Sequence, residues 1–100
     1  MREKIGVALI GCGGIAHPHL AGWQAASDLC EVRALADPNP NALAALQAKA
    51  SGATTYADYT ELLQRDDIQV VEILTPPGAH YPNALDAIEA GKDLLIIKPF

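Results

Sequence analysis

Several marks of other protein classes are missing from these 100 residues. No apolar run approaches the roughly 18–20 residues that a helix needs to span a bilayer. The apolar stretch near the N-terminus is also too short for a signal peptide. With only two cysteines, Cys12 and Cys30, the chain has neither a disulfide framework nor a CxxC metal pair. We therefore expect a cytoplasmic protein, because a reducing compartment suits a chain without disulfides.

Positive charge is scarce as well, and the net charge is −5. Residues 1–50 carry four basic and four acidic side chains, whereas residues 51–100 carry three basic and eight acidic ones. A nucleic-acid surface needs clustered Lys and Arg to neutralise phosphates, so we expect no nucleic-acid partner. Half of the residues are apolar, which is typical of a globular domain, and we expect no membrane partner.

Short apolar runs alternate with helical patterns along the chain. The runs predict strands over residues 5–10, 31–36, 53–56, 69–74 and 94–97. The patterns between them predict helices over residues 14–27, from Asn39-Pro40, from near Asp58, and over 80–90. Such alternation indicates right-handed strand–helix–strand crossovers, and hence an α/β fold with a doubly wound parallel sheet. Prolines follow several strands, at the carboxyl ends where open α/β sheets bind ligands.

Each predicted helix has a candidate buried face. In the first it holds Ala16, Leu20 and Trp23, which we interpret as core rather than as a ligand platform. The later helices contribute further apolar residues, and the last is expected to end at a glycine. These candidates are Leu43 and Leu46, then Leu62 or Leu63, then Tyr81, Leu85 and Ile88, followed by Gly91.

A glycine-rich loop joins the first strand to the first helix. Residues 11–16, Gly-Cys-Gly-Gly-Ile-Ala, match the pattern G-x-G-x-x-G/A of dinucleotide-binding folds. Gly11 would permit the tight turn, Gly13 would let a pyrophosphate approach the backbone, and Ala16 would allow close helix–strand packing. The N–H groups at the start of the helix would then face the phosphates. A purely structural turn is the alternative.

An acidic residue occurs where such a fold needs one. Asp37 lies 21 residues after Ala16, at the predicted end of the second strand, where a carboxylate binds the ribose hydroxyls of NAD. No arginine follows to receive a 2′-phosphate, so we expect NAD rather than NADP as the cofactor. A simple turn or capping role for Asp37 remains open.

Four motifs in this order resemble the glucose–fructose oxidoreductase/inositol dehydrogenase family. They are the glycine loop, Ala-Asp-Pro at 36–38, Tyr-x-Asp-Tyr-x-x-Leu-Leu at 56–63, and Thr75-Pro76-Pro77-Gly78-Ala79-His80 followed by Lys98-Pro99. The resemblance covers about residues 4–100. It implies an NAD-binding Rossmann domain, residues 1–100, ending before the sixth strand and without the family's C-terminal substrate domain.

The resemblance also implies an activity and a set of site residues. Family members move a hydride between a nicotinamide cofactor and a hydroxyl group of a sugar, cyclitol or similar molecule. Lys98 matches the catalytic lysine of their Glu-Lys-Pro signature, whereas Ile97 stands where the family has Glu. The residues expected to contact the cofactor are Gly11, Cys12, Gly13, Gly14, Ile15, Ala16, Asp37, Thr75, Pro76, Pro77, His80 and Lys98.

Other interpretations stay open beside this one. We expect the chain to be inactive alone and the full-length enzyme to be a homo-oligomer. The alternative is a non-catalytic NAD-binding sensor or scaffold, which Ile97 favours. A methyltransferase would share the glycine loop but would not explain Lys98-Pro99. We expect no metal, because His17 and His19 point to different sides of a helix. Cys12 is either an inert filler or a thiol whose pKa the helix N-terminus lowers.

Overall fold

The computed structural model describes residues 3–96, in which strands and helices alternate as expected. All strand pairs are parallel, and the sheet order is β3-β2-β1-β4-β5. The fold is therefore a Rossmann-like α/β sheet, which confirms the predicted class. Its strands are β1 (Ile5–Ile10), β2 (Cys30–Ala36), β3 (Thr54–Tyr56), β4 (Val70–Ile73) and β5 (Asp93–Ile96). Its helices are α1 (Ala16–Ala25), α2 (Pro40–Gln47), α3 (Tyr59–Leu62) and α4 (Pro77–Glu89).

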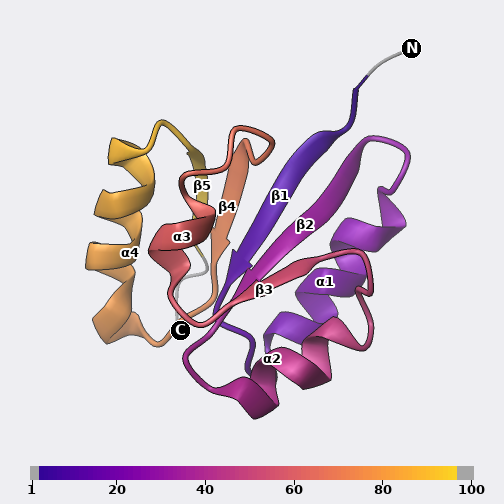
Figure 1. The fold of residues 1–100 in the computed structure, drawn as a ribbon, viewed down its shortest axis with the longest axis horizontal. Helices are drawn as coiled ribbons and strands as arrows, with labels where there is room; N and C mark the ends of the chain where they lie inside the picture. The colour runs from indigo at the N-terminus through magenta and orange to yellow at the C-terminus, as the bar shows by residue number, and fades with distance from the viewer. Residues whose placement is uncertain (1–2, 97–100) are drawn as a thin grey trace.

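Helices cover the sheet on both faces, as Figure 1 shows. The central strand β1 packs against the helices on both faces of the sheet. Its residues Val7 and Leu9 pack on the α1 and α2 side, while Ala8 and Ile10 pack on the α3 and α4 side. All four are at most 2% exposed. A strand buried on both faces has no polar alternation, which is why its sequence reads as one apolar run.

The helix ends follow the local chemistry of the sequence. Asn39 caps α2 by accepting hydrogen bonds from the N–H groups of residues 41 and 42, and Pro40 occupies the first helical position. Asp58 caps α3 in the same way. Gly91 follows α4 with a φ of 80°, and the N–H groups of residues 91 and 92 bond back to the carbonyls of residues 88 and 87. This is the Schellman arrangement, in which glycine is favoured.

The buried face of α4 differs from the prediction. Leu85 and Ile88 are 41% and 59% exposed, while Asn83 and Ala87 are buried. The small alanine lets the helix lie close to the sheet, so the larger side chains turn outward. The helix also begins at Pro77, three residues earlier than predicted, because proline is well tolerated in a first turn. The side chain of Tyr81 lies outside the described part of the chain.

Residues 3–96 lack two features that mark other classes of protein. No helix there is both long and apolar enough to cross a membrane. No group of three or more His, Cys, Asp or Glu side chains in that range gathers in a way that would hold a metal ion.

Candidate functional site: the glycine loop and its neighbours

Gly11 brings three strands together at the carboxyl edge of the sheet. Its φ of 99° lies in the left-handed region, and a Cβ built there would stand 2.8 Å from the carbonyl carbon of Leu74 and from the amide nitrogen of Thr75. Its N–H donates to the carbonyl of Ala36 at 2.8 Å. Only glycine combines this positive φ with the absence of a Cβ that such a close approach requires. The loop after β1 therefore lies directly against the start of the loop after β4.

Asp37 joins the loop after β2 to the same place. Its Oδ2 accepts a hydrogen bond from the backbone N–H of Cys12 at 2.8 Å, and its Oδ1 accepts one from the N–H of Asn39 at 2.8 Å. A carboxylate has about four lone-pair positions, so each oxygen keeps one for a further donor. Asp37 thus fixes the glycine loop and remains able to accept a pair of hydroxyl groups.

The outer side of the loop is open and rich in donors. A Cβ built on Gly13 or Gly14 would meet nothing within 4 Å. Among residues 3–96, the backbone N–H groups of Gly13, Gly14 and Ile15 have no hydrogen-bond partner. Helix α1 begins just beyond, with no side-chain cap and no acid in its first turn. These residues fit a pyrophosphate, which needs close backbone approach and free donors at a helix N-terminus.

The remaining sequence candidates divide into three groups. Ala16 is fully buried beneath the loop, as expected for close helix–strand packing. Thr75 lies beside Gly11, and its Oγ1 donates to the buried Asn83 Oδ1 at 2.7 Å; Pro76 precedes α4 as its cap residue. The candidates that fall outside the described part of the chain are the side chains of Pro77 and His80, and all of Ile97, Lys98 and Pro99.

Cys12 is not an activated thiol. It is only 1% exposed, and its Sγ lies 3.5 Å from the carbonyl oxygen of Ala36, to which it donates. Burial, and then the negative charge of Asp37, raise its pKa to about 12. The suggestion that the helix N-terminus lowers this pKa is therefore wrong, because desolvation outweighs the dipole. Cys12 instead fills space beneath the loop.

The two histidines of α1 have separate partners. Lys49 Nζ donates to His17 Nδ1 at 2.8 Å, whereas His19 Nδ1 donates to Glu72 Oε2 at 3.0 Å. Their divergence agrees with the helical geometry that argued against a shared metal ion. Trp23 packs against the core, as expected, and in addition its Nε1 donates to Glu72 Oε1 at 2.8 Å.

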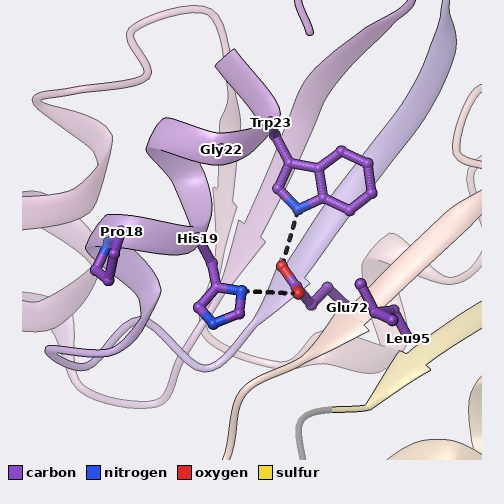
Figure 2. Close-up of a pocket in the computed structure, with 6 residues that line it drawn as sticks. All are labelled: Pro18, His19, Gly22, Trp23, Glu72 and Leu95. Carbon is purple, nitrogen blue, oxygen red and sulfur yellow. Dashed lines mark hydrogen bonds and ion pairs between the residues drawn. The ribbon is translucent and has the colours of Figure 1, made fainter. Parts of the chain in front are cut away.

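Sequence reasoning missed Glu72. It lies within β4 and is 1% exposed. It lines a pocket of about 300 Å³ between α1 and the strands β4 and β5. The other lining residues are Pro18, His19, Gly22, Trp23 and Leu95 (Figure 2). A signal was present, because an acid in the apolar run Val-Val-Glu-Ile-Leu breaks the pattern of a buried strand.

A parallel sheet with a donor-lined glycine loop and an acid at the end of β2 defines a dinucleotide-binding Rossmann domain. Residues 5–100 match the model of a family described as an oxidoreductase family with an NAD-binding Rossmann fold. The chain belongs to this family, which confirms the resemblance found in the sequence. NAD is accordingly the cofactor of the fold.

Individual relatives agree with this assignment. The chain is 34% identical to an inositol 2-dehydrogenase of Gluconacetobacter diazotrophicus over 95% of its own length and 28% of that protein's. It superposes with a TM-score of 0.90 and 34% identity on the WlbA dehydrogenase of Chromobacterium violaceum, solved with NADH and UDP-GlcNAcA, covering 96% of this chain and 28% of that one. A myo-inositol dehydrogenase of Lactobacillus casei, solved with NAD(H) and myo-inositol, gives 0.89 at 30% identity, covering 97% and 29%.

These relatives are much longer than the chain. It spans between a quarter and a third of their length.

Proposed function

We propose that residues 1–100 form the N-terminal, dinucleotide-binding domain of an oxidoreductase. The full-length enzyme moves a hydride between NAD and a hydroxyl group of a sugar, a cyclitol or a similar small molecule. The observation that carries the proposal is the meeting of the open glycine loop with the Asp37 carboxylate, which fixes the loop through Cys12 N–H at 2.8 Å. Phosphate donors and a ribose acceptor thereby share one edge of the sheet.

The loop residues divide the work of binding among themselves. The N–H groups of Gly13, Gly14 and Ile15 donate to the pyrophosphate, and the absent side chains at the two glycines let it approach. Gly11 holds the turn, while Ala16 and Cys12 fill the space beneath it. Asp37 accepts from the ribose hydroxyls.

Other residues are assigned from the family's pattern. The segment Thr75-Pro76-Pro77, with His80, borders the cofactor on the β4 side, and the contact of Thr75 with the glycine loop supports this placement. When bound, the cofactor accepts or returns the hydride. Lys98 receives the hydroxyl proton or polarises the alcohol oxygen.

The choice between NAD and NADP depends on Asp37. Its carboxylate would repel a 2′-phosphate, and no arginine follows it in Pro38-Asn39. The test is a titration of the full chain with NADH, NADPH and S-adenosylmethionine, for the unchanged protein and for Asp37→Ala. We expect NADH to bind best and Asp37→Ala to narrow the gap to NADPH. An unchanged ratio would refute the role of Asp37, and preferred binding of S-adenosylmethionine would point to a methyltransferase.

The substrate class is inferred from relatives, among them the inositol 2-dehydrogenase and the myo-inositol dehydrogenase. Substrate contacts are assigned to a second domain that follows residue 100, so residues 1–100 alone should not turn over substrate. Turnover of a panel of polyols and sugars by the full-length enzyme is the expected result.

A non-catalytic NAD-binding module is the second candidate. Ile97 is the observation that favours it, because the family's signature has a glutamate there. Tight NADH binding by the full-length protein without any turnover on the same panel would select this candidate.

We further propose a cytoplasmic location and a homo-oligomeric full-length enzyme, without nucleic-acid or membrane partners. Cys12 and Cys30 are both free and buried, which suits a reducing compartment. The net charge of −5 argues against binding to nucleic-acid phosphates.

A further inference from the structure

Glu72 places a carboxylate inside the fold, under helix α1. Its strand, β4, lies between β1 and β5, and the residue is 1% exposed. Both carboxylate oxygens accept hydrogen bonds from α1: Oε1 from Trp23 Nε1 at 2.8 Å and Oε2 from His19 Nδ1 at 3.0 Å. Figure 2 shows the two side chains reaching from the helix to this one acceptor.

This arrangement is costly as a means of stabilising a fold. Removing a carboxylate from water costs several kcal/mol, and replacing buried ionic groups with apolar ones is often neutral or stabilising. The residues on either side of Glu72 in β4, Val71 and Ile73, are buried and apolar. An acid at this position is therefore explained by a need to fix the position of its hydrogen-bond partners rather than by a gain in stability.

The other side-chain hydrogen bonds of helix α1 do not reach β4: Lys49 Nζ donates to His17 Nδ1, Gln24 Nε2 donates to the carbonyl of Lys49, and Cys30 Sγ donates to the carbonyl of Trp23. Of its ten residues only Ala16 and Leu20 are buried, and its N-terminus has no side-chain cap. Because His19 and Trp23 are four residues apart, they lie on one side of the helix, one turn from each other. Two bonds to a single rigid strand residue hold the helix both along its axis and in rotation.

The N-terminus of the same helix adjoins the open N–H groups of Gly13, Gly14 and Ile15. We propose that Glu72 is a positioning residue for the dinucleotide: through His19 and Trp23 it holds α1 so that these donors converge on the pyrophosphate. The inference rests on the proposed NAD-binding function. Glu72 itself touches no phosphate in this scheme, and its effect passes through the helix.

The test compares NADH affinity in three variants of the full chain. Glu72→Leu removes both acceptors, and we expect it to weaken NADH binding about tenfold. Glu72→Gln keeps an oxygen for Trp23 and offers an N–H to the other tautomer of His19, so its affinity should stay within about threefold of the parent. Leu62→Ala, in the core on the opposite face, is the control for lost stability without a lost tether. Its NADH affinity should be unchanged.

A second readout checks that the tether is broken. Trp23 is the sole tryptophan among residues 1–100, so the emission spectrum of that chain reports on the surroundings of Trp23. The spectrum should change in Glu72→Leu and remain close to the parent in Leu62→Ala.

Each outcome bears on one claim. If the parent does not bind NADH, the proposed function is wrong. If the parent binds NADH and Glu72→Leu binds it equally well, only the positioning role is wrong. Equal weakening in Leu62→Ala, or no rescue by Glu72→Gln, also overturns that role. Should Glu72→Leu fail to fold, Trp23→Phe replaces it, because it removes one bond and keeps an aromatic side chain. Undiminished NADH affinity in that variant contradicts the proposal.

Discussion

Two glycines of one loop are required for different reasons. At Gly11 the protein itself excludes a side chain, since a Cβ would stand 2.8 Å from the backbone of the β4 loop. At Gly13 a Cβ would meet nothing within 4 Å. The fold therefore does not need the second glycine, which supports the proposal that a ligand approaches the backbone there.

Gly13→Val should separate binding from folding. We expect the variant to fold with nearly the parent's melting temperature, because its side chain points into open space. It should lose NADH affinity by about a hundredfold or more, since the side chain would displace a phosphate from charge-assisted donors. Calorimetric titration with NADH measures the loss. Gly11→Ala is the matched control and should lower the melting temperature instead. Parent-like NADH binding by Gly13→Val would show that the phosphates lie elsewhere.

Cys12 should make stability fall in alkaline solution. Its pKa rises from an ordinary 9.0 to about 12 in the fold. Above pH 9 the unfolded chain loses this proton while the folded chain keeps it, so the free energy of unfolding decreases as pH rises. The slope from this thiol is at most about 1.4 kcal/mol per pH unit.

The measurement for Cys12 is urea unfolding at several pH values between 8 and 11. Cys12→Ala is compared with the parent because tyrosines and lysines titrate in the same range and cancel in the difference. The stability gap between the two proteins should shift in favour of the variant as pH rises. A gap that does not vary with pH would contradict the raised pKa.

At the scale of elements, α2 depends on its first residues. Asn39 Oδ1 accepts from the N–H groups of Asn41 and Ala42. Asn39→Ala should lower the free energy of unfolding by about 1 kcal/mol, the usual cost of a lost N-cap. Asn39→Asp keeps the acceptor and should stay near the parent. Chemical denaturation of the two variants checks this, and an equal loss in both would mean that the cap bond is not the cause.

Local chemistry explains which elements the sequence allowed us to predict. The five strands and four helices that the structure describes within residues 3–96 were all predicted, because the apolar runs, Asn39-Pro40, Asp58 and Gly91 mark them directly. The buried face of α4 was wrong, since periodicity favoured Leu85 and Ile88 whereas the sheet required a small residue, Ala87, at the contact. Which face of α4 is buried depends on how closely the helix approaches the sheet, and the sequence of the helix alone does not show this distance.

The same difference between local signals and long-range contacts holds for the residues of the site. Gly11 and Asp37 were identified from spacing, and the structure places them on one edge of the sheet. The contact of Glu72 with His19 and Trp23 joins residues 49 and 53 positions apart. The spacing of residues along the chain does not indicate such a contact, so the only signal in the sequence was the acid within the apolar run of β4.

At the scale of the whole molecule, the sheet order β3-β2-β1-β4-β5 leaves β5 at an edge. This strand has exposed apolar side chains, with Leu95 at 44% and Ile96 at 37%. An edge strand offers a row of unpaired N–H and C=O groups that a second chain can join. β5 begins at Asp93, and the apolar residues that follow it carry no charge to discourage such pairing. The sequence from 94 to 97 is Leu-Leu-Ile-Ile.

Residues 1–100 produced alone should therefore self-associate through β5. Sedimentation at tens of micromolar should show dimers or larger species. Ile96→Lys should shift them toward monomer, because a charge on an edge strand opposes pairing with a second copy. Leu29→Lys is the matched control, since Leu29 is 51% exposed and precedes β2 rather than lying on the edge; it should leave the association unchanged. A stable monomer of the unchanged chain, or equal effects of the two lysines, would mean that general apolar exposure rather than the β5 edge governs its association.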